Sequence, residues 1–152
     1  METQYFIRSI KVNDLIKINE LLSKNALGSD DIKVHLEHFF VATQSDSIIG
    51  VAGLEVIGKY GLLRSVAVDE RFRGCGIAAS LCSTLEERAV QRGIRRLYLL
   101  TESADQYFLT RGYTVVSRDN VPLAIRKTRQ FSILCPDSAT LMERRLSRWE
   151  LA

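Results

Sequence analysis

The sequence has few of the residues that mark exported or metal-binding proteins. Its 152 residues include two prolines, three cysteines and two histidines. Cys75, Cys82 and Cys135 are odd in number and lack paired spacing, which argues against a disulfide framework and a zinc site. His35 and His38 share a helix face but have no third ligand at a suitable spacing. We therefore expect a reducing, cytoplasmic location and no bound metal.

Long apolar runs and a strong charge imbalance are also missing. No apolar run approaches the roughly 20 residues of a membrane span. Residues 1–15 lack the basic-then-apolar order of a signal peptide. The net charge is +3, too small by itself to indicate a nucleic-acid partner. Residues 118–148 nevertheless carry seven basic and three acidic residues. This excess of positive charge indicates either a solvated basic face or a pocket for a negatively charged ligand.

Hydrophobic periodicity predicts a mixed α/β (α+β) fold. The expected helices span 13–25 with Asn13 as a cap, 30–40, 77–92, 104–112 and 122–131. The expected strands span 5–10, 39–44, 47–58, 62–69, 95–102, 113–119 and 139–146. Three strands in a meander followed by one β-α-β crossover predict a mixed, mostly antiparallel sheet with flanking helices. Without a linker or an internal repeat, we expect residues 1–152 to form one domain.

The stretch Arg71-Phe-Arg-Gly-Cys-Gly-Ile-Ala78 lies where a strand ends and a helix begins. A helix start leaves backbone N–H groups without partners, and residues without a Cβ let an anion approach them. Gly74 and Gly76 therefore predict an anion site, to which Arg71 and Arg73 add charge-assisted hydrogen bonds. A Rossmann site is disfavoured by the antiparallel strands before the loop, and a Walker loop by the absence of a lysine after Gly76.

The loop resembles the Arg/Gln-x-x-Gly-x-Gly/Ala motif of the GNAT superfamily of N-acetyltransferases, whose element order also matches nearly the whole chain. The resemblance implies that the loop holds the pyrophosphate of acetyl-CoA as co-substrate. It also implies a splay between the strands at 62–68 and 96–101, with the thioester in the cleft. The implied cofactor-binding residues are Val66, Ala67 and Val68, through their backbone, and Arg71, Arg73, Gly74, Cys75, Gly76, Ile77 and Ala78.

A narrower resemblance, carried mainly by Phe131-Ser-Ile-Leu-Cys-Pro-Asp-Ser-Ala-Thr-Leu-Met142, is to small N-acetyltransferases associated with arsenic-resistance operons. It implies acetylation of a small amine-bearing metabolite or xenobiotic, such as an amino acid analogue containing arsenic or phosphorus. Neither resemblance fixes the acceptor.

Acetyl transfer to an amine needs a base for the amine proton and is helped by an acid for the leaving thiolate. Many relatives have a tyrosine as the acid, four residues before the glycine that ends the short helix. Here that glycine is Gly112, position 108 is phenylalanine, and Tyr107 is one step away. The acid is absent, comes from elsewhere, or is not needed because coenzyme A thiolate is a tolerable leaving group.

Charged residues inside apolar strands give the remaining site candidates. Glu55 is the candidate base, or else a solvent-facing residue or an ion-pair partner of Arg64. Arg64 binds an acidic acceptor or pairs with Glu55. Arg126 and Arg129 share a helix face and line the acceptor mouth or face solvent.

Two other functions are compatible with the sequence. The missing tyrosine favours a non-catalytic acetyl-CoA sensor that binds a protein partner. The basic segment 118–148 would suit a nucleic-acid-binding protein, but we rank this hypothesis last and do not expect a nucleic-acid partner. We expect the protein to bind a small-molecule amine and not to associate with a membrane. An edge strand at 140–146 would also allow a homodimer to form.

Overall fold

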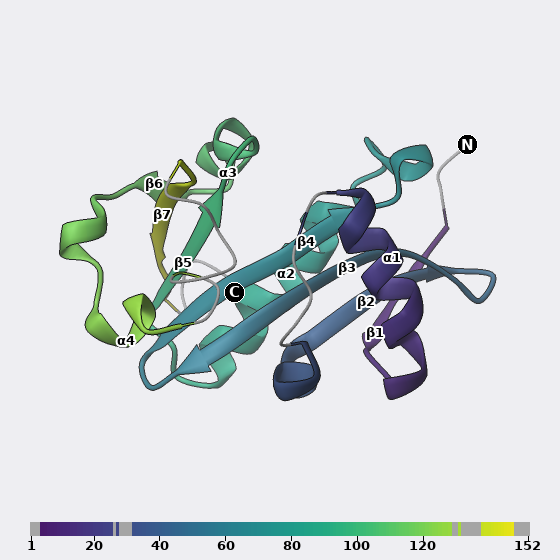
Figure 1. The fold of residues 1–152 in the computed structure, drawn as a ribbon, viewed down its shortest axis with the longest axis horizontal. Coiled ribbons are helices and arrows are strands. Elements are labelled where there is room, and N and C mark those ends of the chain that lie inside the picture. Colours follow the sequence, from purple (N-terminus) through teal and green to yellow (C-terminus); the bar gives the residue numbers. More distant parts are fainter. Residues whose placement is uncertain (1–3, 26, 28–31, 129–130, 132–137, 148–152) are drawn as a thin grey trace. The chain divides into compact units, whose positions relative to one another are not determined.

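A seven-stranded sheet with helices beside it forms the framework of the protein (Figure 1). The computed structural model describes residues 4–25, 27, 32–128, 131 and 138–147. The strands are β1 Phe6–Ser9, β2 Phe39–Gln44, β3 Ser47–Ile57, β4 Tyr60–Val68, β5 Arg96–Thr101, β6 Thr114–Val115 and β7 Thr140–Arg145. The α-helices are α1 Leu15–Lys24, α2 Ile77–Gln91, α3 Asp105–Thr110 and α4 Leu123–Arg126. Short 3-10 helices span Val12–Asp14, Ile32–His38, Glu70–Phe72 and Arg118–Asn120.

The hydrogen-bonded strand order is β1-β2-β3-β4-β5-β7-β6. β4 and β5 are parallel, whereas β1 with β2, β2 with β3, β5 with β7 and β6 with β7 are antiparallel. The predicted fold class, a mixed and mostly antiparallel sheet with flanking helices, is therefore confirmed.

The chain divides into two compact units. The first unit contains residues 1–54 and 65–87, and the second contains residues 55–64 and 88–152. β3 and β4 each run from one unit into the other, because the boundary falls after Leu54 in β3 and after Arg64 in β4.

Helices cover both faces of the sheet in the first unit. On one face, three buried residues of α1 pack with buried residues of the strands; this cluster contains Ile18, Leu21, Leu22, Ile32, Phe39, Val41, Val51 and Ala67. On the other face, a Cβ built on Gly50 would lie 2.9 Å from the Ile77 side chain and 3.2 Å from the Leu81 side chain of α2. Because Ala42 and Gly50 are paired, small residues let α2 lie close to the backbone at this point.

The second unit has its own core beside β4, β5 and β7. Its buried members are Leu62, Tyr98, Val121, Ile125 and Leu141. Burial raises the pKa of Tyr98 to about 12. The Tyr98 hydroxyl therefore stays protonated at neutral pH.

The register of β4 with β5 covers three pairs, from Tyr60 with Arg96 to Leu62 with Tyr98. Beyond Arg64, β4 belongs to the first unit, whereas β5 belongs entirely to the second. The splay between these strands stays a prediction.

Helix ends follow the sequence closely where glycine controls them. Gly93 has a φ of 78° after α2, and the N–H groups of Gly93 and Ile94 donate to the carbonyls of Val90 and Ala89. This is the Schellman arrangement, in which a left-handed glycine satisfies the last carbonyls of a helix. Gly112 ends α3 in the same way, with a φ of 90°.

Three of the expected elements were wrong in their type or extent, and a fourth in its place in the sheet. Residues 32–38 form a 3-10 helix, and Phe39 and Phe40 belong to β2, where β-branched and aromatic residues are favoured. Within the strand expected over 113–119 the structure has β6, Thr114–Val115, and within the helix expected over 122–131 it has α4, Leu123–Arg126, with residues 129 and 130 outside the described residues. The strand at 140–145 is not a sheet edge, since β7 lies between β5 and β6.

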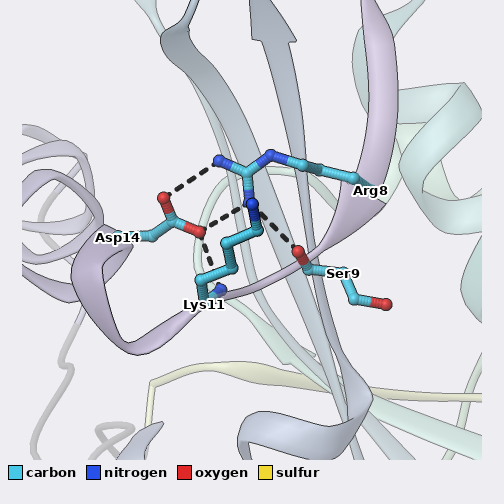
Figure 2. Close-up of polar contacts among 4 residues, drawn as sticks. All are labelled: Arg8, Ser9, Lys11 and Asp14. Carbon is cyan, nitrogen blue, oxygen red and sulfur yellow. Dashed lines mark hydrogen bonds and ion pairs between the residues drawn. The ribbon is translucent and has the colours of Figure 1, made fainter.

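Asn13 does not cap α1. The helix is preceded by the 3-10 turn Val12–Asp14, and Asp14 organises the entry instead (Figure 2). Its carboxylate accepts hydrogen bonds from Arg8 Nη1 and Nη2, at 2.7 and 3.0 Å, and from the Lys11 backbone N–H at 2.7 Å. The bonds from Arg8 hold the pKa of the Asp14 carboxyl below its usual value.

No helix within the described residues has the length and apolar character needed to cross a bilayer.

Replacing Asp14 with Asn should lower the free energy of unfolding at pH 7 by about 1 kcal/mol, because the ion pair and the turn bond are weakened. The Asp14 pKa is lowered on folding, so its contribution is present above the unfolded pKa of about 4 and is lost as the pH falls below that value. Urea unfolding between pH 7 and pH 2 should give a shallower pH dependence for Asp14→Asn than for wild type. The exposed Asp119 provides the control Asp119→Asn. Equal pH dependence in wild type and Asp14→Asn would contradict this role.

Gly53→Ala should destabilise the protein by about 1–3 kcal/mol, because the new Cβ would lie 2.3–2.5 Å from ring atoms of Phe39 on the neighbouring strand. Urea unfolding measures the loss. Adding Phe39→Leu to Gly53→Ala should cost less than the sum of the two single changes, since the smaller side chain relieves the clash. Strictly additive losses would show that the ring is not the obstacle.

Candidate functional site

The loop between β4 and α2 belongs entirely to the first unit. The chain leaves β4 at Val68, forms the 3-10 turn Glu70–Phe72 and enters α2 at Ile77. Val66 is half-buried, and Ala67 and Val68 are buried. Residues 73–76 are all exposed, so the loop presents its backbone to solvent between two buried anchors.

Gly74 and Gly76 have φ angles of 79° and 82°, in the region that L-residues with a Cβ rarely adopt. A Cβ built on Gly74 would meet no atom within 4 Å, and one built on Gly76 would meet only the Tyr5 hydroxyl, at 4.0 Å. The space beside these glycines is therefore open, and a ligand can approach the backbone there.

The start of α2 supplies hydrogen-bond donors to this open space. The first backbone bond into the helix runs from the Ser80 N–H to the Gly76 carbonyl, at 3.0 Å. Within the described part of the chain, the N–H groups of Gly76, Ile77 and Ala78 donate to no protein acceptor. Together with the helix dipole, these groups suit a phosphate or pyrophosphate.

The two arginines of the loop are held by protein partners. Arg71, with a side chain 79% exposed, donates to both carboxylate oxygens of Asp69 through Nε at 3.2 Å and Nη2 at 3.0 Å. These bonds lower the pKa of the Asp69 carboxyl and raise that of the Arg71 guanidinium. Arg73 Nη2 donates to Asn25 Oδ1 at 2.8 Å. An anion at the loop would compete with Asp69 for Arg71.

Cys75 is exposed within the loop, and its Sγ lies 3.9 Å from the Arg73 carbonyl oxygen. Ile77 is buried and Ala78 is half-buried. Cys82 is buried in α2, while Cys135 lies outside the described residues.

Ser65 was missed by the sequence reasoning. It lies in the middle of β4, is buried, and has a φ of 58°, which is strained for a residue with a Cβ. Its distortion immediately precedes Val66, where the implied pantetheine contacts begin. No residue pattern signals it, because a left-handed serine inside an apolar run has no distinctive neighbours.

Glu55 and Arg64 form a buried ion pair in the second unit. Arg64 Nη1 donates to Glu55 Oε1 at 2.6 Å, and the two side chains are 0% and 5% exposed for arginine and glutamate respectively. The structure thus shows the pairing that the sequence left as one alternative, and it excludes a solvent-facing Glu55. Buried charges persist only when paired in this way, and removing one partner typically costs about 3–5 kcal/mol.

The position of the usual acid is part of the core. Phe108 is buried, and its ring meets that of Tyr113 edge to face with centroids 5.5 Å apart. Tyr107, the preceding residue of the short helix α3, is 36% exposed, whereas Phe108 is 5% exposed. A tyrosine hydroxyl one residue away therefore does not take the place of Phe108.

Arginines of the basic segment 118–148 donate hydrogen bonds to backbone carbonyls of the same segment. Arg126 Nη2 donates to the Arg118 carbonyl at 2.9 Å, and Arg118 Nη2 donates to the Ala139 carbonyl at 2.8 Å. The Arg118 guanidinium also lies over the Phe131 ring, 5.2 Å from its centroid. Arg126 thus has a structural contact, while Arg129, Arg148 and Trp149 lie outside the described residues.

Metal ligands are not gathered in the described part of the chain, where no group of three His, Cys, Asp or Glu residues is placed to hold an ion. The described residues include His38, which is buried, but not the side chain of His35.

The chain is similar to curated proteins that include a ligase and amino-acid acetyltransferases. It is 28% identical over 146 residues to a [citrate [pro-3S]-lyase] ligase of Haemophilus influenzae, which covers 93% of this chain and 38% of that protein. It is 26% identical over 132 residues to an amino-acid acetyltransferase of Serratia proteamaculans, covering 81% of this chain and 30% of the relative. The chain thus spans about a third of the length of these relatives.

Solved structures share the fold. The N-acetylglutamate synthase of Neisseria gonorrhoeae, complexed with coenzyme A and N-acetyl-glutamate, has a TM-score of 0.83 at 23% identity, covering 97% of this chain and 36% of that one. A GNAT-family acetyltransferase of Staphylococcus aureus has a TM-score of 0.79 at 18% identity, covering 95% of this chain and 100% of that one.

The sequence profile of the Acetyltransferase (GNAT) family matches residues 13–113, a stretch that begins before α1 and ends after α3. It includes β4, the loop with Gly74 and Gly76, and the whole of α2. Since this match covers well over half of the chain, the protein belongs to the GNAT family of acetyltransferases.

Proposed function

We propose that this protein is an acetyl-CoA-dependent N-acetyltransferase of a small amine-bearing metabolite or xenobiotic. The observation that carries the proposal is the start of α2, where the Cβ positions of Gly74 and Gly76 are open and where, within the described residues, the N–H groups of Gly76, Ile77 and Ala78 have no protein acceptor. Family membership and the solved neighbour that holds coenzyme A support the same ligand. We also propose that residues 1–152 are one catalytic domain, since β3 and β4 each contribute to both units.

The residues of this chain would divide the work as follows. The N–H groups of Gly76, Ile77 and Ala78 would hold the pyrophosphate, and the backbone of residues 66–68 the pantetheine arm. When bound, acetyl-CoA supplies the activated acetyl group. Glu55 would take the proton of the attacking amine, directly or through a water, with Arg64 holding its carboxylate in place.

The acceptor class is the finer part of the proposal. Relatives named amino-acid acetyltransferases favour an amino acid or an analogue of one. An analogue containing arsenic or phosphorus, and a role in arsenic or antimetabolite resistance, rest on the resemblance at residues 131–142, of which only 131 and 138–142 are described. The cytoplasmic location and the homodimer stay predictions.

A non-catalytic acetyl-CoA sensor is the second candidate. It is favoured by the burial of Phe108 at the acid position and by the engagement of Glu55 with Arg64. The two candidates differ in turnover: an enzyme releases free coenzyme A thiol with an amino acid or amine panel, whereas a sensor binds acetyl-CoA without releasing thiol.

Coenzyme A at about 100 times its dissociation constant should stabilise the wild-type protein by roughly 2.7 kcal/mol, measured as a thermal shift. Gly74→Glu should abolish this gain, because it adds bulk and negative charge where the pyrophosphate binds. Gly58→Glu is a matched control: Gly58 also has a positive φ, of 60°, and open space around it, but lies in the β3–β4 turn. An unchanged shift in Gly74→Glu would remove the loop from the binding site.

Glu55→Gln should lower kcat about 100-fold or more if Glu55 is the base, with an unchanged thermal shift on coenzyme A addition. The measurement is thiol release against pH with the best amine of the panel. Glu86→Gln is the control, since Glu86 is a buried glutamate on α2. A Glu55→Gln protein that stays folded and keeps its kcat would assign Glu55 to the ion pair alone.

A further inference from the structure

Tyr5 lies just before β1 and reaches the start of α2, which is more than 70 residues away in the sequence. Its hydroxyl lies 3.3 Å from the Gly76 carbonyl oxygen and 2.6 Å from Ser80 Oγ. Tyr5 is half-buried, and all three residues belong to the first unit. The contact therefore joins the N-terminal segment to the glycine loop within one compact body.

Counting hydrogens assigns the direction of both bonds. A tyrosine hydroxyl has one hydrogen to donate, and a backbone carbonyl can only accept. The arrangement that satisfies both contacts has the Ser80 hydroxyl donating to Tyr5 and the Tyr5 hydroxyl donating to Gly76. The Gly76 carbonyl also accepts the Ser80 N–H at 3.0 Å, so both of its lone pairs are used.

Fixing this carbonyl fixes a neighbouring N–H group. The Gly76 carbonyl and the Ile77 N–H belong to one planar trans peptide, in which they point in opposite directions. The helical bond from the Ser80 N–H and the bond from the Tyr5 hydroxyl both hold this carbonyl. Together they restrain the direction in which the Ile77 N–H points on the other side of the plane.

We propose that Tyr5 is a positioning residue for the co-substrate: through the Gly76 carbonyl, it aims the Ile77 N–H at the pyrophosphate. This inference rests on the proposed function. It assigns no contact between Tyr5 and the reacting atoms.

The test compares coenzyme A binding by wild type and Tyr5→Phe, using calorimetry for affinity and the ¹⁵N–¹H resonance of the Ile77 amide as a local reporter. Removing one neutral hydrogen bond should weaken affinity about threefold to tenfold. The shift of the Ile77 resonance on coenzyme A addition should become smaller in the variant. A general loss of stability would not reduce the ligand-induced shift at the Ile77 amide alone.

Two further variants sharpen the comparison. Ser80→Ala removes the donor to Tyr5 in a helix that tolerates alanine, and its effect should not add to that of Tyr5→Phe, because both act through one carbonyl. Tyr60→Phe is the matched control: within the described residues the Tyr60 hydroxyl makes no hydrogen bond, and its ring packs against Tyr98 in the second unit. This variant should bind coenzyme A as wild type does.

Wild-type affinity and a wild-type Ile77 shift in Tyr5→Phe would overturn the positioning role while leaving the proposed function intact. Weaker binding with an unaltered Ile77 shift would overturn it too. A wild-type protein that does not bind coenzyme A would overturn the proposed function first, so the two failures are distinguishable.

Discussion

Left-handed backbone at Gly74 and Gly76 is the constraint on which the loop between β4 and α2 depends. It turns the chain from the end of β4 into α2 and leaves open space at the Cβ positions of both glycines. A residue with a Cβ would strain this turn and would also occupy the volume that a phosphate needs. The two glycines thus combine a conformational requirement with a chemical one, which is why a poor helix former stands where a helix begins.

Glu55 and Arg64 form a buried ion pair, and the proposed function asks the same pair to take part in the chemistry as well. Their side chains are almost fully buried and 2.6 Å apart, so each charge compensates the other. A carboxylate held in this way has a fixed orientation, which a base requires, but it must also accept a proton beside a guanidinium. Because these two requirements conflict, substitutions at Glu55 and Arg64 distinguish an enzyme from a sensor most directly.

Much of the fold followed from patterns that are local in sequence. The apolar stripe of α2 and its terminal Gly93 placed that helix to within a residue or two, because both signals act over one or two turns. Residues 30–40 were harder to predict, since Phe39 and Phe40 fit a helical pattern but pair with β3 as part of β2. The helix expected at 122 is α4, which ends at Arg126, and no local signal marks that end. For the site, the loop glycines were visible in the sequence. The φ of Ser65, the bond from Arg73 to Asn25 and that from Tyr5 to Gly76 depend on residues brought together only by folding.

The contact between Tyr5 and Ser80 spans 75 residues, half the length of the chain. Such separations make a contact slow to form, because the intervening chain must first lose its freedom. During synthesis Tyr5 leaves the ribosome early, and it cannot contact Ser80 until α2 has also left the ribosome. The contact between the N-terminal segment and the start of α2 is therefore formed late, and a chain whose synthesis stops before Ser80 cannot form it.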